Sequence, residues 1–402
     1  MEDATAHVDS IVADAIDRGA SDIHFVPVAG GLSVQLRIKG EVETTELLIP
    51  IDAAGTVVAA LKGLAGISAD AGPVSNGVAM RPFGGMSVVL NVSTFPTHRG
   101  ESVSIRLGRT AALPSLDDLD LDPDLVTRAR SALTFRPHGV VLTTGGAGSG
   151  KSTTIHMFMA EARRPGQRVM TVEDQLSFEI PDVLQSTTSE GFGIAQALRA
   201  MTGADCDIAL AGQLQTSEEM TAAFDLARNG TMVFSVLDAP DAPGALHRLI
   251  NGGVDPSLVC SLLNLVMGQR LLGKSCPDCQ RWRPATEEEI ERLDLPASGV
   301  EVVASEGCES CDGRGSKGRM IVTELVTMSP PLAAALEQGA DVQSIREALG
   351  ADFVSIEDGI RKHVRAGAVP VDVAMNHVGR RPELTGSLQA VASAATRDTQ
   401  LS

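Results

Sequence analysis

The stretch GGAGSGKS at residues 145–152 decides the fold of the segment around it. It follows the apolar run GVVLTT at 139–144 and precedes TTIHMFMAEA at 153–162, which has helical spacing. The spacing fits G-x-x-x-x-G-K-[ST], a phosphate-binding loop between a strand and a helix. In such a loop, backbone N–H groups point at phosphate oxygens, and the helix adds its positive N-terminal end. The stretch therefore predicts a bound nucleoside triphosphate.

Within this loop, Lys151 is expected to reach the β- and γ-phosphates, and Ser152 is expected to hold Mg²⁺. The predicted nucleotide-binding residues of the segment are Gly145, Gly146, Ala147, Gly148, Ser149, Gly150, Lys151, Ser152 and Thr153.

Composition limits the class of protein. The 402 residues suggest two to four domains, and a hydrophobic content of 43% supports sizeable cores. The net charge of −18, the absence of Tyr and the single Trp argue against direct binding of nucleic acid, which needs clustered cations or stacking aromatics. The sequence has no apolar run of about 18 residues and no secretory signal at its start. We therefore expect a cytoplasmic protein without a transmembrane segment.

Residues 1–110 have the pattern of a small α+β domain. Apolar residues recur at helical spacing in 7–19, and Gly19 follows as a stop signal. Alternating apolar and polar residues in 21–28 and 31–43 predict two strands around a Gly-Gly turn. Residues 53–66 are typical of a helix, and 85–108 of two further strands. An acidic linker with two prolines is expected at 111–124.

From residue 125 the pattern changes to that of a nucleotide-binding α/β domain, which we predict at 125–272. The short apolar runs VVLTT, RVMTVED, DIALAG and TMVFSVL alternate with helical stretches. Runs that are apolar on both sides suit parallel strands buried beneath helices. A cysteine-bearing module is predicted at 273–320 and a helical C-terminal part at 321–380. We expect the polar tail at 381–402 to be disordered.

Four of the six cysteines form two Cys-x-x-Cys pairs, Cys276 with Cys279 and Cys308 with Cys311, separated by 28 residues. Thiolates at this spacing can complete a tetrahedral Zn²⁺ site, and four protein ligands leave no open position. The pattern therefore predicts a structural zinc. A zinc ribbon that binds nucleic acid is an alternative, which the acidic segment between the pairs disfavours.

Several stretches together make the chain resemble the secretion ATPase superfamily, specifically the type II secretion and type IV pilus assembly ATPases. The resemblance covers residues 8–377. In the N-terminal part it is carried by AIDRGASDIHFVP and VSTFPTHRGESVSIRL, and then by the loop GGAGSGKSTT. Three further stretches stand at the positions of family motifs: TVEDQLSFEIP at the aspartate box, ALRAMTGADCDIALAGQLQ at the second acidic motif, and SVLDAPDAPGALHRLINGGVDPSLV at the histidine box. The four cysteines complete the resemblance.

This resemblance implies an α/β protein with a PAS-like N-terminal α+β domain, a RecA-like ATPase domain, a zinc module and a helical C-terminal part. It implies ATP, Mg²⁺ and Zn²⁺ as cofactors and a homo- or hetero-hexameric ring. The implied partners are an inner-membrane platform protein of a pilus or secretion machine and an active ATPase paralogue, with a peripheral place at the inner membrane. Assembly members usually carry a further N-terminal docking domain, which we expect this chain to lack because it starts close to the nucleotide-proximal domain.

Hydrolysis needs more than a phosphate cradle, because water must be activated and negative charge must be neutralised. The family has a glutamate at the end of the strand in DIALAGQLQT, where this chain has Gln213, which cannot accept a proton. An arginine of the family nearby is Gln215 here. The histidine of the histidine box is Asp238, whose charge would repel a γ-phosphate.

The aspartate box also departs from the family pattern. The aspartate box keeps Glu173, the candidate catalytic base, and Asp174, but the next proline of the family is Gln175 and its second glutamate is Ser177.

This chain also has fewer of the arginines that the family places near the phosphates. Arg106 and Arg199 match family positions expected to contact phosphate across domains, whereas their partner positions hold Asn91 and Gly203. Arginines at such positions can contribute several orders of magnitude in rate.

The sequence leaves three functions open. The first is a nucleotide-binding homologue with weak or absent hydrolysis, which serves as a scaffold or regulatory subunit. The second is an active hexameric motor in which Glu173 serves as the base. The third is an interaction protein with a vestigial nucleotide site.

Overall fold

The structure is a computed structural model, which describes residues 2–38, 41–68, 72, 74–108, 113–119, 121–189, 191–296 and 299–378. The predicted tail at 381–402 lies outside these residues. The chain divides into two compact units. The first comprises Met1–Ser115, Arg136–Val141 and Ser152–Val236, and the second comprises Leu116–Phe135, Leu142–Lys151 and Leu237–Ser402.

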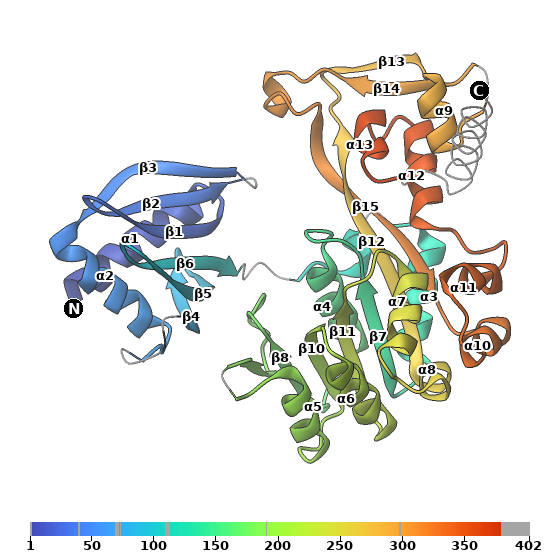
Figure 1. Ribbon diagram of the computed structural model, residues 1–402, viewed down its shortest axis with the longest axis horizontal. Coiled ribbons are helices and arrows are strands. Elements are labelled where there is room, and N and C mark those ends of the chain that lie inside the picture. The colour runs from blue at the N-terminus through green and yellow to red at the C-terminus, as the bar shows by residue number, and fades with distance from the viewer. Residues whose placement is uncertain are drawn as a thin grey trace, which may run out of the picture. The chain divides into compact units, whose positions relative to one another are not determined.

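The first unit begins with a six-stranded antiparallel sheet of strand order β3-β2-β1-β6-β5-β4 (Figure 1). Two helices pack on it through an apolar core. The elements are α1 (Glu2–Asp17), β1 (Ala20–Val28), β2 (Gly31–Ile38), β3 (Glu41–Pro50), α2 (Ile51–Leu64), β4 (Asn76–Phe83), β5 (Met86–Thr97) and β6 (Gly100–Gly108).

Local sequence explains most of this sheet. On β2, the alternating residues Leu32, Val34 and Leu36 are buried in the core, as their spacing predicts. Strand β4 was not predicted, because Gly77 and Pro82 weaken its strand signal. A proline is tolerated there since β4 lies at the edge of the sheet.

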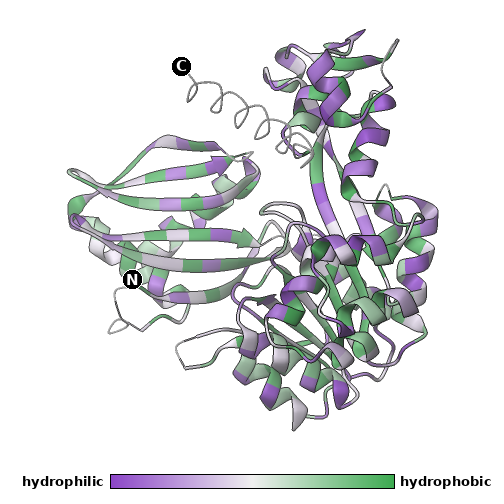
Figure 2. Cartoon of the chain, turned by 45° about the vertical axis from the view of Figure 1, so that its right-hand side comes forward, coloured by the Kyte–Doolittle hydropathy of each residue, from purple (hydrophilic) through white to green (hydrophobic). Residues whose placement is uncertain are grey.

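A seven-stranded sheet has the order β15-β12-β7-β11-β10-β8-β9. Every residue of β7 and β11 is buried, as their mainly apolar runs predict, and Figure 2 shows hydrophobic residues concentrated in such strands. Strand β8 pairs in parallel with β9 and β10, whereas β12 and β15 are antiparallel, so the sheet is mixed. The strands are β7 (Gly139–Thr144), β8 (Val169–Glu173), β9 (Leu184–Thr187), β10 (Ile208–Leu214), β11 (Met232–Leu237), β12 (Leu263–Ser275) and β15 (Ser316–Val326).

Several of the helices that alternate with these strands begin at side-chain caps. Thr216 and Glu219 form a capping box at the start of α6, and Asp241 caps α7. The helices are α3 (Pro123–Thr134), α4 (Lys151–Ala162), α5 (Ile194–Thr202), α6 (Ser217–Arg228), α7 (Ala242–Asn251) and α8 (Pro256–Leu262).

The second unit ends in a small cysteine-bearing module and a group of helices that share an apolar core with the ends of β12 and β15. The sole tryptophan, Trp282, lies on β13 and packs so closely on Gly367 that a Cβ there would come within 2.5 Å of its ring. The elements are β13 (Gln280–Pro284), α9 (Glu287–Leu293), β14 (Glu301–Ser305), α10 (Pro330–Glu337), α11 (Val342–Leu349), α12 (Ile356–Arg365) and α13 (Val371–Met375).

A buried carboxylate joins two of these helices to the sheet. Glu324 on β15 accepts hydrogen bonds from the backbone N–H of Ala242 at 2.5 Å and of Ile356 at 2.9 Å. These are the first residues of α7 and α12, so one side chain caps two helix N-termini. The architecture as a whole confirms the predicted α/β fold class.

Candidate functional site

The segment 145–152 turns sharply between β7 and α4. Gly145, Gly148 and Gly150 have φ angles of 139°, 72° and 88°, which only glycine adopts readily. A Cβ at Gly145 would lie 2.2 Å from the carbonyl oxygen of Gln269. The loop therefore has the backbone conformation and the close packing that the motif predicts.

Lys151 lies with its ammonium inside the loop. Its Nζ donates hydrogen bonds to the carbonyl oxygens of Gly145 at 2.8 Å and Gly146 at 2.7 Å. Burial lowers the pKa of Lys151, and the negative charge of Asp238 opposes that shift. Asp238, at the position of the histidine box, thus interacts electrostatically with the ammonium group of Lys151.

The residues of the loop fit a phosphate group. The Oγ of Ser149 is buried and has no hydrogen-bond partner within the described part of the chain. A buried polar atom without a partner is costly, and a phosphate oxygen would supply an acceptor for it. Lys151 and Ser152 would hold a triphosphate and its Mg²⁺, which supplies charge neutralisation when bound.

Gln269 on β12 is a residue of this site that the sequence prediction missed. It is fully buried, and its Nε2 donates a hydrogen bond of 2.6 Å to the carbonyl oxygen of Ser149. Its Oε1 has no partner among the described residues. The available signal was a polar residue in the apolar run LNLVMGQRLLG. Gln269 therefore fixes the phosphate loop against the neighbouring strand.

Glu173, the candidate base, ends β8 and is almost fully buried beside His156 of α4. The Nε2 of His156 lies 3.3 Å from Oε1 of Glu173, and its Nδ1 lies 2.7 Å from the carbonyl oxygen of Ser152. Burial disfavours the charged imidazole, but the hydrogen bond and the charge of Glu173 outweigh it and raise the pKa of His156. The sequence prediction did not include His156.

Residues of the predicted aspartate box contact strands β5 and β6. Gln175 accepts a hydrogen bond of 3.1 Å from Nη1 of Arg106, whose Nε donates to Asp22 at 3.0 Å. Asn91 donates to the carbonyl oxygen of Leu176 at 2.9 Å. Arg106 is therefore held by a carboxylate and an amide of the protein.

Arg199 is likewise paired within the protein. It projects from α5, where its Nη2 donates to Glu218 at 2.7 Å, and Gly203 caps the end of the same helix.

Gln213 lies half-buried near the end of β10, and the backbone N–H of Gln215 donates to Glu219. The carboxylate of Asp238 lies 4.0 Å from Arg248. Of the positions that the sequence analysis singled out, Gln175 and Asn91 have side-chain hydrogen bonds to the protein, and Asp238 lies near an arginine.

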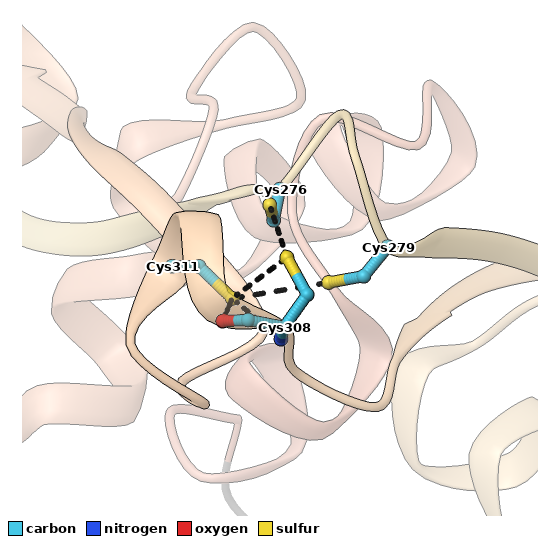
Figure 3. Close-up of side chains that lie close together, drawn as sticks. All are labelled: Cys276, Cys279, Cys308 and Cys311. Carbon is cyan, nitrogen blue, oxygen red and sulfur yellow. Dashed lines mark hydrogen bonds between the residues drawn. The ribbon is translucent and has the colours of Figure 1, made fainter.

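The four predicted metal ligands converge. Their sulfur atoms all lie within 4.8 Å of one another, and Figure 3 shows the side chains pointing toward a common centre. The Sγ–Sγ distance is 3.9 Å for Cys276 and Cys308 and also for Cys279 and Cys311. It is 3.7 Å for Cys308 and Cys311. A tetrahedral Zn²⁺ with Zn–S bonds of about 2.3 Å separates its sulfur atoms by about 3.8 Å. The cluster therefore fits a structural zinc, which would tie the module together.

Backbone groups support one of these thiolates. The N–H groups of Cys308 and Gly315 point at Sγ of Cys311, at 3.2 and 3.3 Å. Burial would raise the pKa of this thiol, but these hydrogen bonds, together with those from the thiols of Cys308 and Cys279, lower it to about 6.

Fold and loop geometry together define a P-loop nucleotide-binding protein of the α/β class. The family described as Type II/IV secretion system protein matches residues 3–377, and the chain belongs to this family. The chain is a homologue of assembly ATPases of type II secretion and type IV pilus machinery.

Two relatives illustrate the similarity. Type II secretion system protein E of Klebsiella pneumoniae is 30% identical over 90% of this chain and 73% of its own length. The type IV pilus assembly ATPase PilB of Thermus thermophilus is 31% identical over 86% of this chain and 39% of its own length.

Solved structures share the fold. The crystal structure of the pilus retraction motor PilT with bound ADP matches with a TM-score of 0.68 at 19% identity, over 94% of this chain and 98% of that one. The ATPase DotB of Legionella pneumophila matches with a TM-score of 0.64 at 16% identity, over 92% and 94% of the two chains. Among the residues that the structure describes, no helix is both long and apolar enough to cross a bilayer.

The clamp on the phosphate loop can be tested by Gln269→Ala. Removing a buried donor leaves the Ser149 carbonyl unpaired and loosens the loop, at a cost of about 1–3 kcal/mol. We expect nucleotide affinity, measured with a fluorescent ATP analogue, to fall about tenfold. Met267→Leu, a volume-conserving change two residues earlier on β12, serves as the control. Unchanged affinity in Gln269→Ala would show that the loop holds its shape without this bond.

The metal centre predicts about one zinc per chain by elemental analysis of freshly purified protein, given four ligands. Cys308→Ser should remove the zinc and lower the melting temperature, because a structural metal contributes folding free energy. Cys260→Ser, a cysteine outside the cluster, should keep the zinc. Purified protein without zinc would contradict the assignment.

The pair His156–Glu173 predicts a pH dependence of stability. Because the pKa of His156 is raised in the folded state, its stabilising contribution is complete below about pH 6.5 and is lost as pH rises through the folded value. Denaturant unfolding of wild type and His156→Gln should therefore differ most at pH 6, and the difference should shrink toward pH 9. A difference that grows with pH would contradict this assignment.

Proposed function

We propose that this protein binds ATP with Mg²⁺ but hydrolyses it weakly or not at all, and acts as a scaffold or regulatory subunit of a type IV pilus or type II secretion machine. The observation that carries the proposal is an intact phosphate loop combined with a neutral Gln213 and with the charge of Asp238 acting on Lys151. A phosphate loop without an acidic side chain to activate water binds a nucleotide without hydrolysing it efficiently.

The arginines support the same function. Arg106 is bound to Asp22 and Gln175, and Arg199 to Glu218. An arginine that neutralises a transition state must exchange such partners for phosphate oxygens, and that exchange costs binding energy. The lost partner arginines at Asn91 and Gly203 reduce the available positive charge further.

The proposal extends to assembly. We place the protein in a homo- or hetero-hexameric ring in the cytoplasm, at the inner-membrane platform protein of its machine and beside an active ATPase paralogue. The cysteine module would hold Zn²⁺ as a structural element. The relatives named for type II secretion and pilus assembly support this placement.

An active motor is the second candidate, and the observation that favours it is Glu173, an acid retained at the end of a strand next to the helix of the phosphate loop. That function requires Glu173→Gln to abolish turnover.

Nucleotide titration and a phosphate-release assay on pure protein with Mg²⁺ separate these functions. We expect a fluorescent ATP analogue to bind, Lys151→Ala to weaken binding, and turnover to stay at least about a hundredfold below the roughly 1 s⁻¹ at the low end of typical enzymes. Turnover near that value, lost in Lys151→Ala, would overturn the proposal in favour of the motor. Absence of binding at millimolar nucleotide would favour an interaction protein.

A further inference from the structure

His156 occupies an unusual place for a buried imidazole. It lies on α4 five residues after Lys151, and only 1% of it is exposed. The ring of Phe178 packs against it with centroids 5.1 Å apart. Both ring nitrogens therefore meet protein atoms.

The hydrogen-bond partners of Nδ1 and Nε2 of His156 determine which of these nitrogens carries a proton. Nδ1 faces the carbonyl oxygen of Ser152 at 2.7 Å, which can only accept, so Nδ1 carries a hydrogen. Nε2 faces Oε1 of Glu173 at 3.3 Å, and an ionised carboxylate can also only accept. The contact is a hydrogen bond only when a proton lies between Nε2 and Oε1.

This proton bears directly on hydrolysis. When water attacks a γ-phosphorus, an O–P bond forms, the bond to the β–γ bridging oxygen breaks, and the proton of the water passes to a base. A carboxylate that already accepts a hydrogen bond from a positive neighbour is a weak base for this purpose. The Oε1 of Glu173 is engaged in this contact.

We propose that His156 is a positioning residue that ties the Glu173 carboxylate to α4 and so withholds it from activating water. This inference rests on the proposed function and deepens it, because it explains why the acid retained in the aspartate box does not restore hydrolysis. The restraint is anchored at both ends: one nitrogen is fixed to the backbone of Ser152 at the start of α4, and the other to the end of β8.

Replacing the histidine tests the restraint. His156→Phe removes both donors while keeping a buried ring, and His156→Met, whose flexible side chain adapts to irregular gaps, is a second variant for the same purpose. We expect phosphate release to rise at least about tenfold in these variants, a part of the roughly 10²–10⁴-fold that a positioned base contributes.

Three comparisons separate positioning from a merely structural role. His156→Gln retains an N–H donor and should raise turnover much less than His156→Phe. Adding Glu173→Gln to His156→Phe should remove the gain. Met157→Leu, the next residue on α4 and also buried, is a volume-conserving control that should leave turnover as in the wild type.

The outcomes distinguish this inference from the proposed function. Low turnover in the wild type with no rise in either His156→Phe or His156→Met overturns the inference and leaves the proposed function standing. Fast turnover in the wild type overturns the proposed function. A rise that persists after Glu173→Gln shows that another group is the base and also overturns the inference.

Discussion

The hydrogen bond between Gln269 and the carbonyl oxygen of Ser149 is the constraint on which the nucleotide site depends. It is buried, it is 2.6 Å long, and it joins the phosphate loop to β12. The same strand continues to Ser275, next to Cys276, and pairs from Val266 onward with β15, with an irregularity between Gly273 and Ser275. The paired strands β12 and β15 therefore connect the phosphate loop with the cysteine cluster, so both are built on a common element.

Three of the positions at which the sequence analysis expects a departure from the family pattern have neighbours within the protein. Gln175 accepts a bond from Arg106, Asn91 holds the backbone of Leu176, and Asp238 lies near Arg248. Each of these three side chains has a polar neighbour within the protein. Glu173 is contacted in the same way by His156. The polar groups of these side chains are thus satisfied by contacts within the protein.

Sequence patterns predicted what depends on neighbours in the chain. The loop, the buried strands β7 and β11 and the first helix follow from motif spacing and periodicity, and the cysteine cluster follows from ligand spacing. The ribbon of β12 and β15 was missed, because a long apolar run does not distinguish strand from helix by periodicity. Gln269 was missed because its partner is 120 residues away, and His156 because its role appears only when β8 lies against α4.

The placement of Trp282 has a consequence for spectroscopy. The chain has one tryptophan and no tyrosine, and that tryptophan lies on β13 in the cysteine module, half-exposed and packed on Gly367. Tryptophan fluorescence of the protein thus arises from this module alone. A change in tryptophan emission during heating or dilution into denaturant reports the surroundings of β13, and the nucleotide-binding strands can lose their structure without a direct tryptophan signal from within them.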